Sequence, residues 1–317
     1  MCFEEIFNES EILLTEGAIV ERLKSEFNAK LDQYINHAGL IYSNLGYLEK
    51  IYEQYINIGK KHDLPIMLMT PTRKVNIDSI SKSPYYSKNI ISDSCKFLNK
   101  LKKVDKDYSK NILMGGLLGC KGDAYSSKES LSKEESYHFH RHQTTLFRKE
   151  KIDFLFAGIM PEIYEAIGMA KAMAETGIPY IISFMVRKDG CLIDSTPISS
   201  AINIIDMEVS PKPVCYMANC IHPSNLKIAL KNPKNLDNPH IDRFKGIQAN
   251  ASSLSPEDLN NSTALKQEDF SVMVDEMLLL YKEFNLKIFG GCCGTNDVFL
   301  DLLSKRLVCS SSSNLFL

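Results

Sequence analysis

Short, almost continuous apolar runs alternate along the chain with longer segments in which apolar residues recur every three to four positions. The apolar runs lie at 11–15, 65–70, 111–119, 151–158, 178–186, 212–219, 243–250 and 286–291. Such a run is typical of a parallel strand that is covered on both faces, whereas the segments between the runs have helical periodicity. Eight strand-helix units predict a (β/α)8 TIM barrel of the α/β class.

Helices are predicted most clearly over 46–62, 135–150, 161–177 and 267–284. Pro161 suits the first turn of a helix, and Gly177 suits a left-handed end. Two polar stretches without a clear period, 71–95 and 222–240, predict long loops after the second and sixth strands. In a barrel these loops lie at the C-terminal face of the strands, over the active site.

Length and composition allow one large barrel or two medium domains, and favour a globular protein that acts on small molecules. A chain of 317 residues, 44% hydrophobic and 24% charged, can bury a sizeable core as one barrel. We expect this domain to span 1–309, with a flexible tail over 310–317. Lys and Arg (37) nearly balance Asp and Glu (39), which argues against a nucleic-acid partner. The sequence has no membrane-length apolar run and no signal-like N-terminus, so we expect a cytoplasmic protein without a membrane role.

The segment FGGCCGT at 289–295 has the most informative chemistry in the chain. Adjacent side chains on a regular strand point to opposite faces, but the flanking glycines allow a turn that aims Cys292 and Cys293 at one ion. Cys220, at the end of another predicted strand, is the best third ligand. The weaker alternatives are Cys120, Cys191 and Cys215. Three thiolates and one open position form the catalytic pattern for zinc, although the residues alone leave a pair of buried thiols equally open.

The three cysteines, in ANC at 218–220 and GGCCGT at 290–295, resemble those of the homocysteine S-methyltransferase family of zinc barrels. Looser similarity to the family lies at 13–23, 51–73, 114–125 and 183–196. The resemblance implies a methyltransferase in which Cys220, Cys292 and Cys293 hold Zn²⁺, with no catalytic group beyond the metal site. It also implies that zinc deprotonates a substrate thiol, expected to be homocysteine, which attacks the methyl group of a sulfonium, a quaternary ammonium or a folate to give methionine.

Substrate contacts are expected at the strand-end residues Glu16, Gly17, Thr70, Asn219 and Gly291. Glu16 takes the place of a first-strand aspartate in the family. Gly158 stands where family members commonly have a glutamate that contacts the amino group of homocysteine. The missing acid leaves open a different thiol or methyl donor, and a non-catalytic zinc or thiol sensor is a further hypothesis.

Two other motifs receive structural interpretations. Glu162 is expected to interact with the positive end of a helix rather than with substrate. The motif HFHRH places His138 and His142 on one helix face and His140 on another, on the side of the barrel opposite the active face. We therefore interpret it as a solvated helix rather than a metal site.

Overall fold

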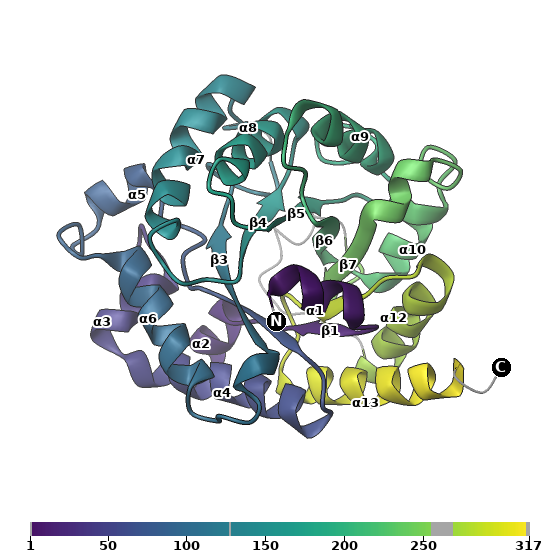
Figure 1. Cartoon of the computed structure of the whole chain (residues 1–317), viewed down its shortest axis with the longest axis horizontal. Helices are drawn as coiled ribbons and strands as arrows, with labels where there is room; N and C mark the ends of the chain where they lie inside the picture. The colour runs from purple at the N-terminus through teal and green to yellow at the C-terminus, as the bar shows by residue number, and fades with distance from the viewer. Residues whose placement is uncertain (1, 127, 255–268, 315–317) are drawn as a thin grey trace.

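The computed structural model describes residues 2–126, 128–254 and 269–314 and confirms the predicted barrel. Eight parallel strands pair in sequence order, and β8 closes the sheet on β1 (Figure 1). The strands are β1 (Leu13–Thr15), β2 (Ile66–Met69), β3 (Ile112–Leu118), β4 (Phe154–Met160), β5 (Tyr180–Met185), β6 (Cys215–Ile221), β7 (Phe244–Ala249) and β8 (Ile288–Gly291). Each strand overlaps an apolar run of the sequence.

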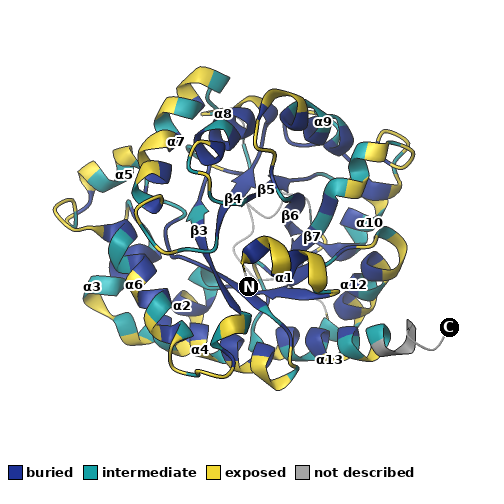
Figure 2. Ribbon diagram, viewed as in Figure 1, coloured by how far each residue is buried: buried dark blue, intermediate teal, exposed yellow. Residues whose placement is uncertain are grey.

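Helices surround the barrel and cover its outer face (Figure 1). They are α1 (Phe3–Glu9), α2 (Val20–Phe27), α3 (Leu40–Ser43), α4 (Leu45–Lys61), α5 (Ile77–Lys82), α6 (Ile90–Lys102), α7 (Lys133–Phe147), α8 (Ile163–Ala174), α9 (Ile198–Glu208), α10 (Pro223–Lys231), α12 (Phe270–Phe284) and α13 (Asp297–Asn314), with short 3-10 helices η1 (His37–Gly39), η2 (Ser109–Asn111) and η3 (Pro239–Arg243). Figure 2 shows buried positions along the strands and exposed positions on the outer helix faces. None of the helices in the described part of the chain has the length and apolar character of a bilayer span.

The N-terminal helix α1 closes one mouth of the barrel (Figure 1). Phe3, Ile6 and Phe7 pack in one buried cluster with residues that begin strands, among them Cys215. The rings of Phe3 and Phe154 lie 4.7 Å apart between centroids. Because α1 covers the end at which the strands begin, the mouth at their C-terminal ends is left for a site.

The two long loops predicted over 71–95 and 222–240 are wrong in part. The first contains α5 and the start of α6, and the second contains α10 and η3. α10 follows β6 almost directly, begins with Pro223, and buries Leu226 and Leu230 at helical spacing. The polar residues over 223–231 therefore lie on a short helix, and only the rest of the segment is largely loop.

The interpretation of HFHRH as a solvated helix is wrong for one of its histidines. His138 and His142 are exposed on α7, but His140 is buried. Its Nε2 lies 3.0 Å from Oε1 of Glu165 on α8. His140 lies on the helix face that also buries Ser136 and Gln143, at the three-to-four-residue spacing of a packed face. Among the described residues, no third metal ligand joins the His140–Glu165 pair.

The C-terminal helix passes through the predicted start of the tail. α13 continues to Asn314, so 310–314 are helical, and 315–317 lie outside the described residues. The helix therefore crosses the domain boundary proposed at 309.

Candidate metal centre and substrate pocket

Three cysteine side chains converge at the C-terminal mouth of the barrel. The sulfurs of Cys220, Cys292 and Cys293 all lie within 4.8 Å of one another. Those of Cys292 and Cys293 are 4.0 Å apart, and those of Cys220 and Cys292 are joined as a disulfide between Cα atoms 5.5 Å apart. Within the described ranges this is the one group of three or more potential metal ligands so closely spaced. The alternative ligands Cys120, Cys191 and Cys215 are buried elsewhere.

Cys220 reaches the cluster through a bulge in β6. Asn219 lines the cavity, so regular alternation along the strand would turn Cys220 away from it. The pairing of β6 with β7 shifts register between Asn219 and Ile221, and Cys220 has a φ of 56°. The bulge allows two consecutive side chains to face the same cavity.

The glycines around Cys292 and Cys293 have two different roles. Gly294 has a φ of 79°, in the left-handed region that suits glycine, and so turns the chain after the cysteines. At Gly290 an added Cβ would lie 1.9 Å from Oγ1 of Thr15, so this position instead allows β8 and β1 to approach closely. The turn therefore depends on Gly294 rather than on all the flanking glycines.

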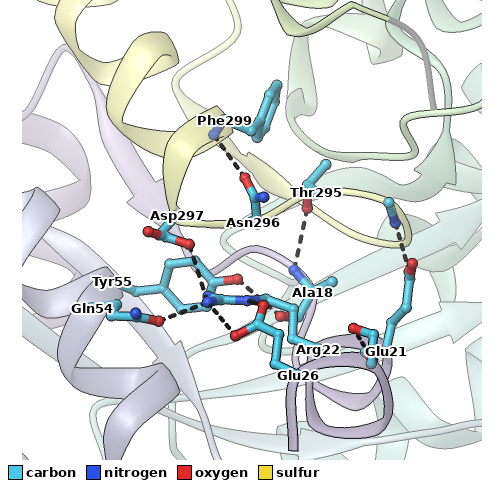
Figure 3. A network of polar contacts seen from close by, with 12 residues as sticks. Ala18, Glu21, Arg22, Glu26, Gln54, Tyr55, Thr295, Asn296, Asp297 and Phe299 are labelled. Carbon is cyan, nitrogen blue, oxygen red and sulfur yellow. Dashed lines mark hydrogen bonds and ion pairs between the residues drawn. The ribbon is translucent and has the colours of Figure 1, made fainter.

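A network of polar contacts fixes the loop after β8 against the segment after β1 (Figure 3). The backbone N–H of Gly294 donates to Oε2 of Glu21 over 2.6 Å. Arg22, which is nearly buried, pairs with Asp297 at 3.1 Å and with Glu26 on its own helix. These contacts help to position the loop that carries two of the cysteines.

A cavity of about 390 Å³ lies beside the cysteines. Its lining contains all the substrate contacts expected from the sequence, namely Glu16, Gly17, Thr70, Asn219 and Gly291, together with the three cysteines. The residues that were selected because they lie at predicted strand ends therefore all line the same cavity.

Thr70 and Asn219 use their polar groups mainly to hold neighbouring strands together. Ser183 Oγ donates to the Asn219 amide oxygen, and the Asn219 amide nitrogen donates to Gln248. Thr70 Oγ1 lies 2.7 Å from Oγ1 of Thr72. These contacts shape the cavity wall and leave few free donors on either residue.

The cavity wall at the end of β4 is apolar. Gly158 lines the cavity, and a Cβ added there would meet the Phe156 ring at 2.7 Å. Glu162, four residues on, caps α8 by accepting hydrogen bonds from the backbone N–H groups of Tyr164 and Glu165. This confirms the structural interpretation of Glu162 and leaves no carboxylate from β4 in the cavity lining.

Several cavity residues were missed in the sequence, among them Arg73, His37 and Tyr125. Arg73 lies in the segment after β2, His37 lies in η1, and Tyr125 lies in the loop after β3. The Tyr125 hydroxyl is in hydrogen-bond contact with the Cys293 sulfur. The strand-end rule that selected Thr70 also points to Arg73, whereas nothing in the local sequence marks His37.

Comparison with known proteins decides the family. The family model described as homocysteine S-methyltransferase matches residues 13–307. The chain belongs to the homocysteine S-methyltransferase family. This match confirms the family resemblance that was based on the three cysteines, and it identifies the chain as a methyltransferase. No curated protein sequence matches it significantly.

Solved structures agree with this family fold. The metallated form of the homocysteine methyltransferase MmuM from Escherichia coli superposes with a TM-score of 0.75 at 19% identity, over 95% of this chain and 98% of that one. Its oxidized form gives 0.74 at 18% identity, over 95% and 97%. Its apo form gives 0.70 at 19% identity, over the same shares as the oxidized form. At such low identity the likeness shows the shared barrel.

The cysteines of this family member fit a tetrahedral metal once they are reduced. Zinc binds thiolate sulfur at about 2.3 Å, which separates two ligands of a tetrahedron by about 3.8 Å. The 4.0 Å between the Cys292 and Cys293 sulfurs is close to that value. A cysteine binds a metal as its thiolate, so Cys220 and Cys292 would act as ligands in their reduced form.

Glu16, at the C-terminal end of β1, is withdrawn from solvent. It is buried, and its Oε2 accepts a hydrogen bond from the Met69 N–H at 3.3 Å. Burial raises the pKa of Glu16 to about 8, although backbone hydrogen bonds act in the opposite direction. In the metal-free protein the carboxyl group is therefore mainly protonated at neutral pH.

A Glu16→Gln variant is expected to lose less stability than the wild type as pH rises from about 5 to about 8. The folded protein keeps the Glu16 proton until pH approaches about 8, whereas the unfolded chain releases it near 4.5. The free energy of unfolding of the wild type therefore falls across this window, by an amount on the order of a few kcal/mol. Urea unfolding of the reduced, metal-free proteins at several pH values measures the difference.

The exposed substitution Glu134→Gln on α7 is the matched control, because the Glu134 side chain is 81% exposed. It should follow the wild type at every pH. Parallel stability curves for the wild type and Glu16→Gln would show that Glu16 ionises normally.

Proposed function

We propose that this chain is a zinc-dependent S-methyltransferase that methylates a thiol, with homocysteine as the leading substrate and methionine as the product. The observation that carries the proposal is the convergence of Cys220, Cys292 and Cys293 on one cavity in a member of the homocysteine S-methyltransferase family. A metallated form of the Escherichia coli homocysteine methyltransferase supports a metal at this site. Three thiolate ligands favour zinc over harder cations.

The cavity residues would hold the reactants and keep water out. A zinc ion on the three cysteines would bind the substrate sulfur and favour its thiolate at neutral pH. Tyr125, in contact with Cys293, stabilises the negative charge of that ligand. Phe156 and Ile159 line the same cavity as the cysteines, and their apolar side chains would suit a methyl group during transfer.

Methyl transfer by this route balances without a protein nucleophile. The thiol proton passes to solvent as the sulfur becomes a thiolate. One sulfur–carbon bond then forms, and the bond between the methyl carbon and the donor sulfur or nitrogen breaks. The donor keeps that electron pair: a sulfonium or a quaternary ammonium leaves as a neutral sulfide or amine, and a folate takes up one proton at its nitrogen. The residues of the chain therefore need only bind, orient and desolvate the two reactants.

A different thiol or methyl donor is the second candidate. Gly158 lies in the cavity lining without a carboxylate, and the Phe156 ring occupies the space beside it. An ammonium group would find no acid on that wall. This observation favours a substrate whose recognition depends on other parts of the cavity.

Metal analysis and a donor panel test the proposal. The reduced protein, reconstituted with zinc and desalted, should hold about one zinc per chain. With homocysteine and either S-methylmethionine, glycine betaine or a methyl-folate, mass spectrometry should detect methionine. A chelator should stop the reaction, and added zinc should restore it. Turnover that persists in chelator, or a protein that retains no zinc, contradicts the proposal, and ligand binding without any methyl transfer would instead indicate a sensor.

A further inference from the structure

Arg73 brings an unbalanced positive charge to the cavity. It lines the cavity from the segment after β2. Across the described residues, its guanidinium has no hydrogen bond or ion pair to a protein group. The two acids of the cavity lining are engaged elsewhere, since Glu16 accepts from Met69 and Glu21 accepts from Gly294. A half-buried guanidinium without a partner is suited to receive an anion.

The stem of Arg73 is fixed in place by Gly119, which follows β3. A Cβ added at Gly119 would lie 2.6 Å from the Arg73 carbonyl oxygen and 2.7 Å from its Cγ. The arginine therefore crosses directly over a residue that has no side chain. This packing limits the conformations of the stem and keeps the charge near the cavity.

His37 provides an independent sign of a missing ligand. It lines the same cavity, is only 6% exposed, and its Nδ1 is buried without a hydrogen-bond partner among the described residues. Burial first, and then the charge of Arg73, lower the pKa of His37 to about 3. The imidazole is therefore neutral and can donate one N–H, while a buried polar atom left unpaired is costly.

We propose that Arg73 and His37 form a carboxylate-binding subsite in this cavity, which receives the carboxylate of one of the two reactants. The proposal rests on the proposed function for the identity of those reactants. A planar carboxylate can accept two hydrogen bonds from the guanidinium, and the imidazole N–H supplies another. Both an amino-acid thiol and a zwitterionic methyl donor carry such a group.

Calorimetric binding to the zinc-loaded protein tests the subsite without requiring turnover. One ligand pair is homocysteine and 3-aminopropane-1-thiol, which lacks the carboxylate, and the other is glycine betaine and tetramethylammonium. Arg73→Met keeps the stem that packs on Gly119 and removes the charge. It should weaken binding of one carboxylated ligand by about 10- to 100-fold. Binding of the matching ligand that lacks the carboxylate should stay unchanged.

The ligand pair that responds identifies the source of the carboxylate. An effect on homocysteine places the thiol in the subsite, and an effect on glycine betaine places the donor there. Arg73→Lys should retain part of the affinity, and His37→Gln should cause a smaller loss for the same ligand. Arg141→Met, an exposed change on α7, is the matched control and should have no effect.

Two results would overturn the subsite. One is an Arg73→Met protein that binds every ligand as the Arg141→Met protein does. The other is a wild-type protein that does not distinguish the carboxylated from the uncarboxylated member of either pair. If the protein distinguishes the carboxylated ligands but transfers no methyl group, the subsite is supported and the proposed reaction is rejected. If methyl transfer occurs and Arg73→Met leaves it unaffected, the reaction is supported and the subsite is rejected.

Discussion

Serine at Cys220, Cys292 or Cys293 is expected to reduce the zinc content from about one ion per chain to a small fraction, with zinc affinity weakened more than about 100-fold. A serine hydroxyl stays protonated at neutral pH and is a poor ligand for zinc compared with a thiolate. Methyl transfer should fall by at least about 30-fold, because a substrate thiol without the metal is mostly protonated at neutral pH. Metal analysis after dialysis and initial rates with the best donor measure the two effects.

The same substitution elsewhere separates a metal effect from a general effect of losing sulfur. Cys309 is exposed on α13, away from the cluster, so Cys309→Ser should keep both zinc and activity. Cys120→Ser tests the alternative ligand closest to the cavity residues in sequence. Full zinc content in Cys220→Ser, or its loss in Cys120→Ser alone, would mean that the ligand set is wrong.

The barrel can be predicted from the sequence because a parallel strand that is buried on both faces is encoded by a short, continuous apolar run. Each strand overlaps a short apolar run, and the runs recur between segments of helical periodicity. Short helices have a weaker pattern of apolar positions in the sequence. α10 has few buried positions between polar residues, and α1 buries Phe3 and Phe7 in the barrel mouth, a contact that depends on the closed sheet. Local periodicity contains no information about that partner.

The metal cluster was accessible from sequence for a different reason. Strand ends of a barrel meet at one face, so the topology brings the segments that carry Cys220 and the Cys292–Cys293 pair to the same mouth. The bulge that turns Cys220 inward was not foreseeable, because it depends on how β6 pairs with β7. His37 escaped notice because its place in the cavity depends on the path of the loop before α4. His140 was misjudged since its partner Glu165 lies on the next helix.

Gly290→Ala is expected to destabilise the protein by about 3 kcal/mol, because the added methyl group has no space between β8 and β1. Its Cβ would lie 1.9 Å from Oγ1 of Thr15, and 2.9 and 3.0 Å from the backbone oxygens of Thr15 and Glu16. The Thr15 side chain is buried and accepts a hydrogen bond from Gln248, so it cannot turn away freely. The backbone oxygens can move only if the two strands separate. Urea unfolding followed by circular dichroism measures the loss.

Strand separation at this point should also disturb the metal site. Gly291, next to Gly290, donates its N–H to the Glu16 carbonyl oxygen over 3.1 Å, and Cys292 follows directly. Gly290→Ala should therefore lower zinc affinity together with stability. Gly46→Ala is the matched control: Gly46 is exposed on α4 with no atom within 4 Å of an added Cβ, so alanine should stabilise the helix by about 0.5–1 kcal/mol. If Gly290→Ala is as stable as Gly46→Ala and keeps its zinc, then the approach of β8 to β1 does not position the cysteines.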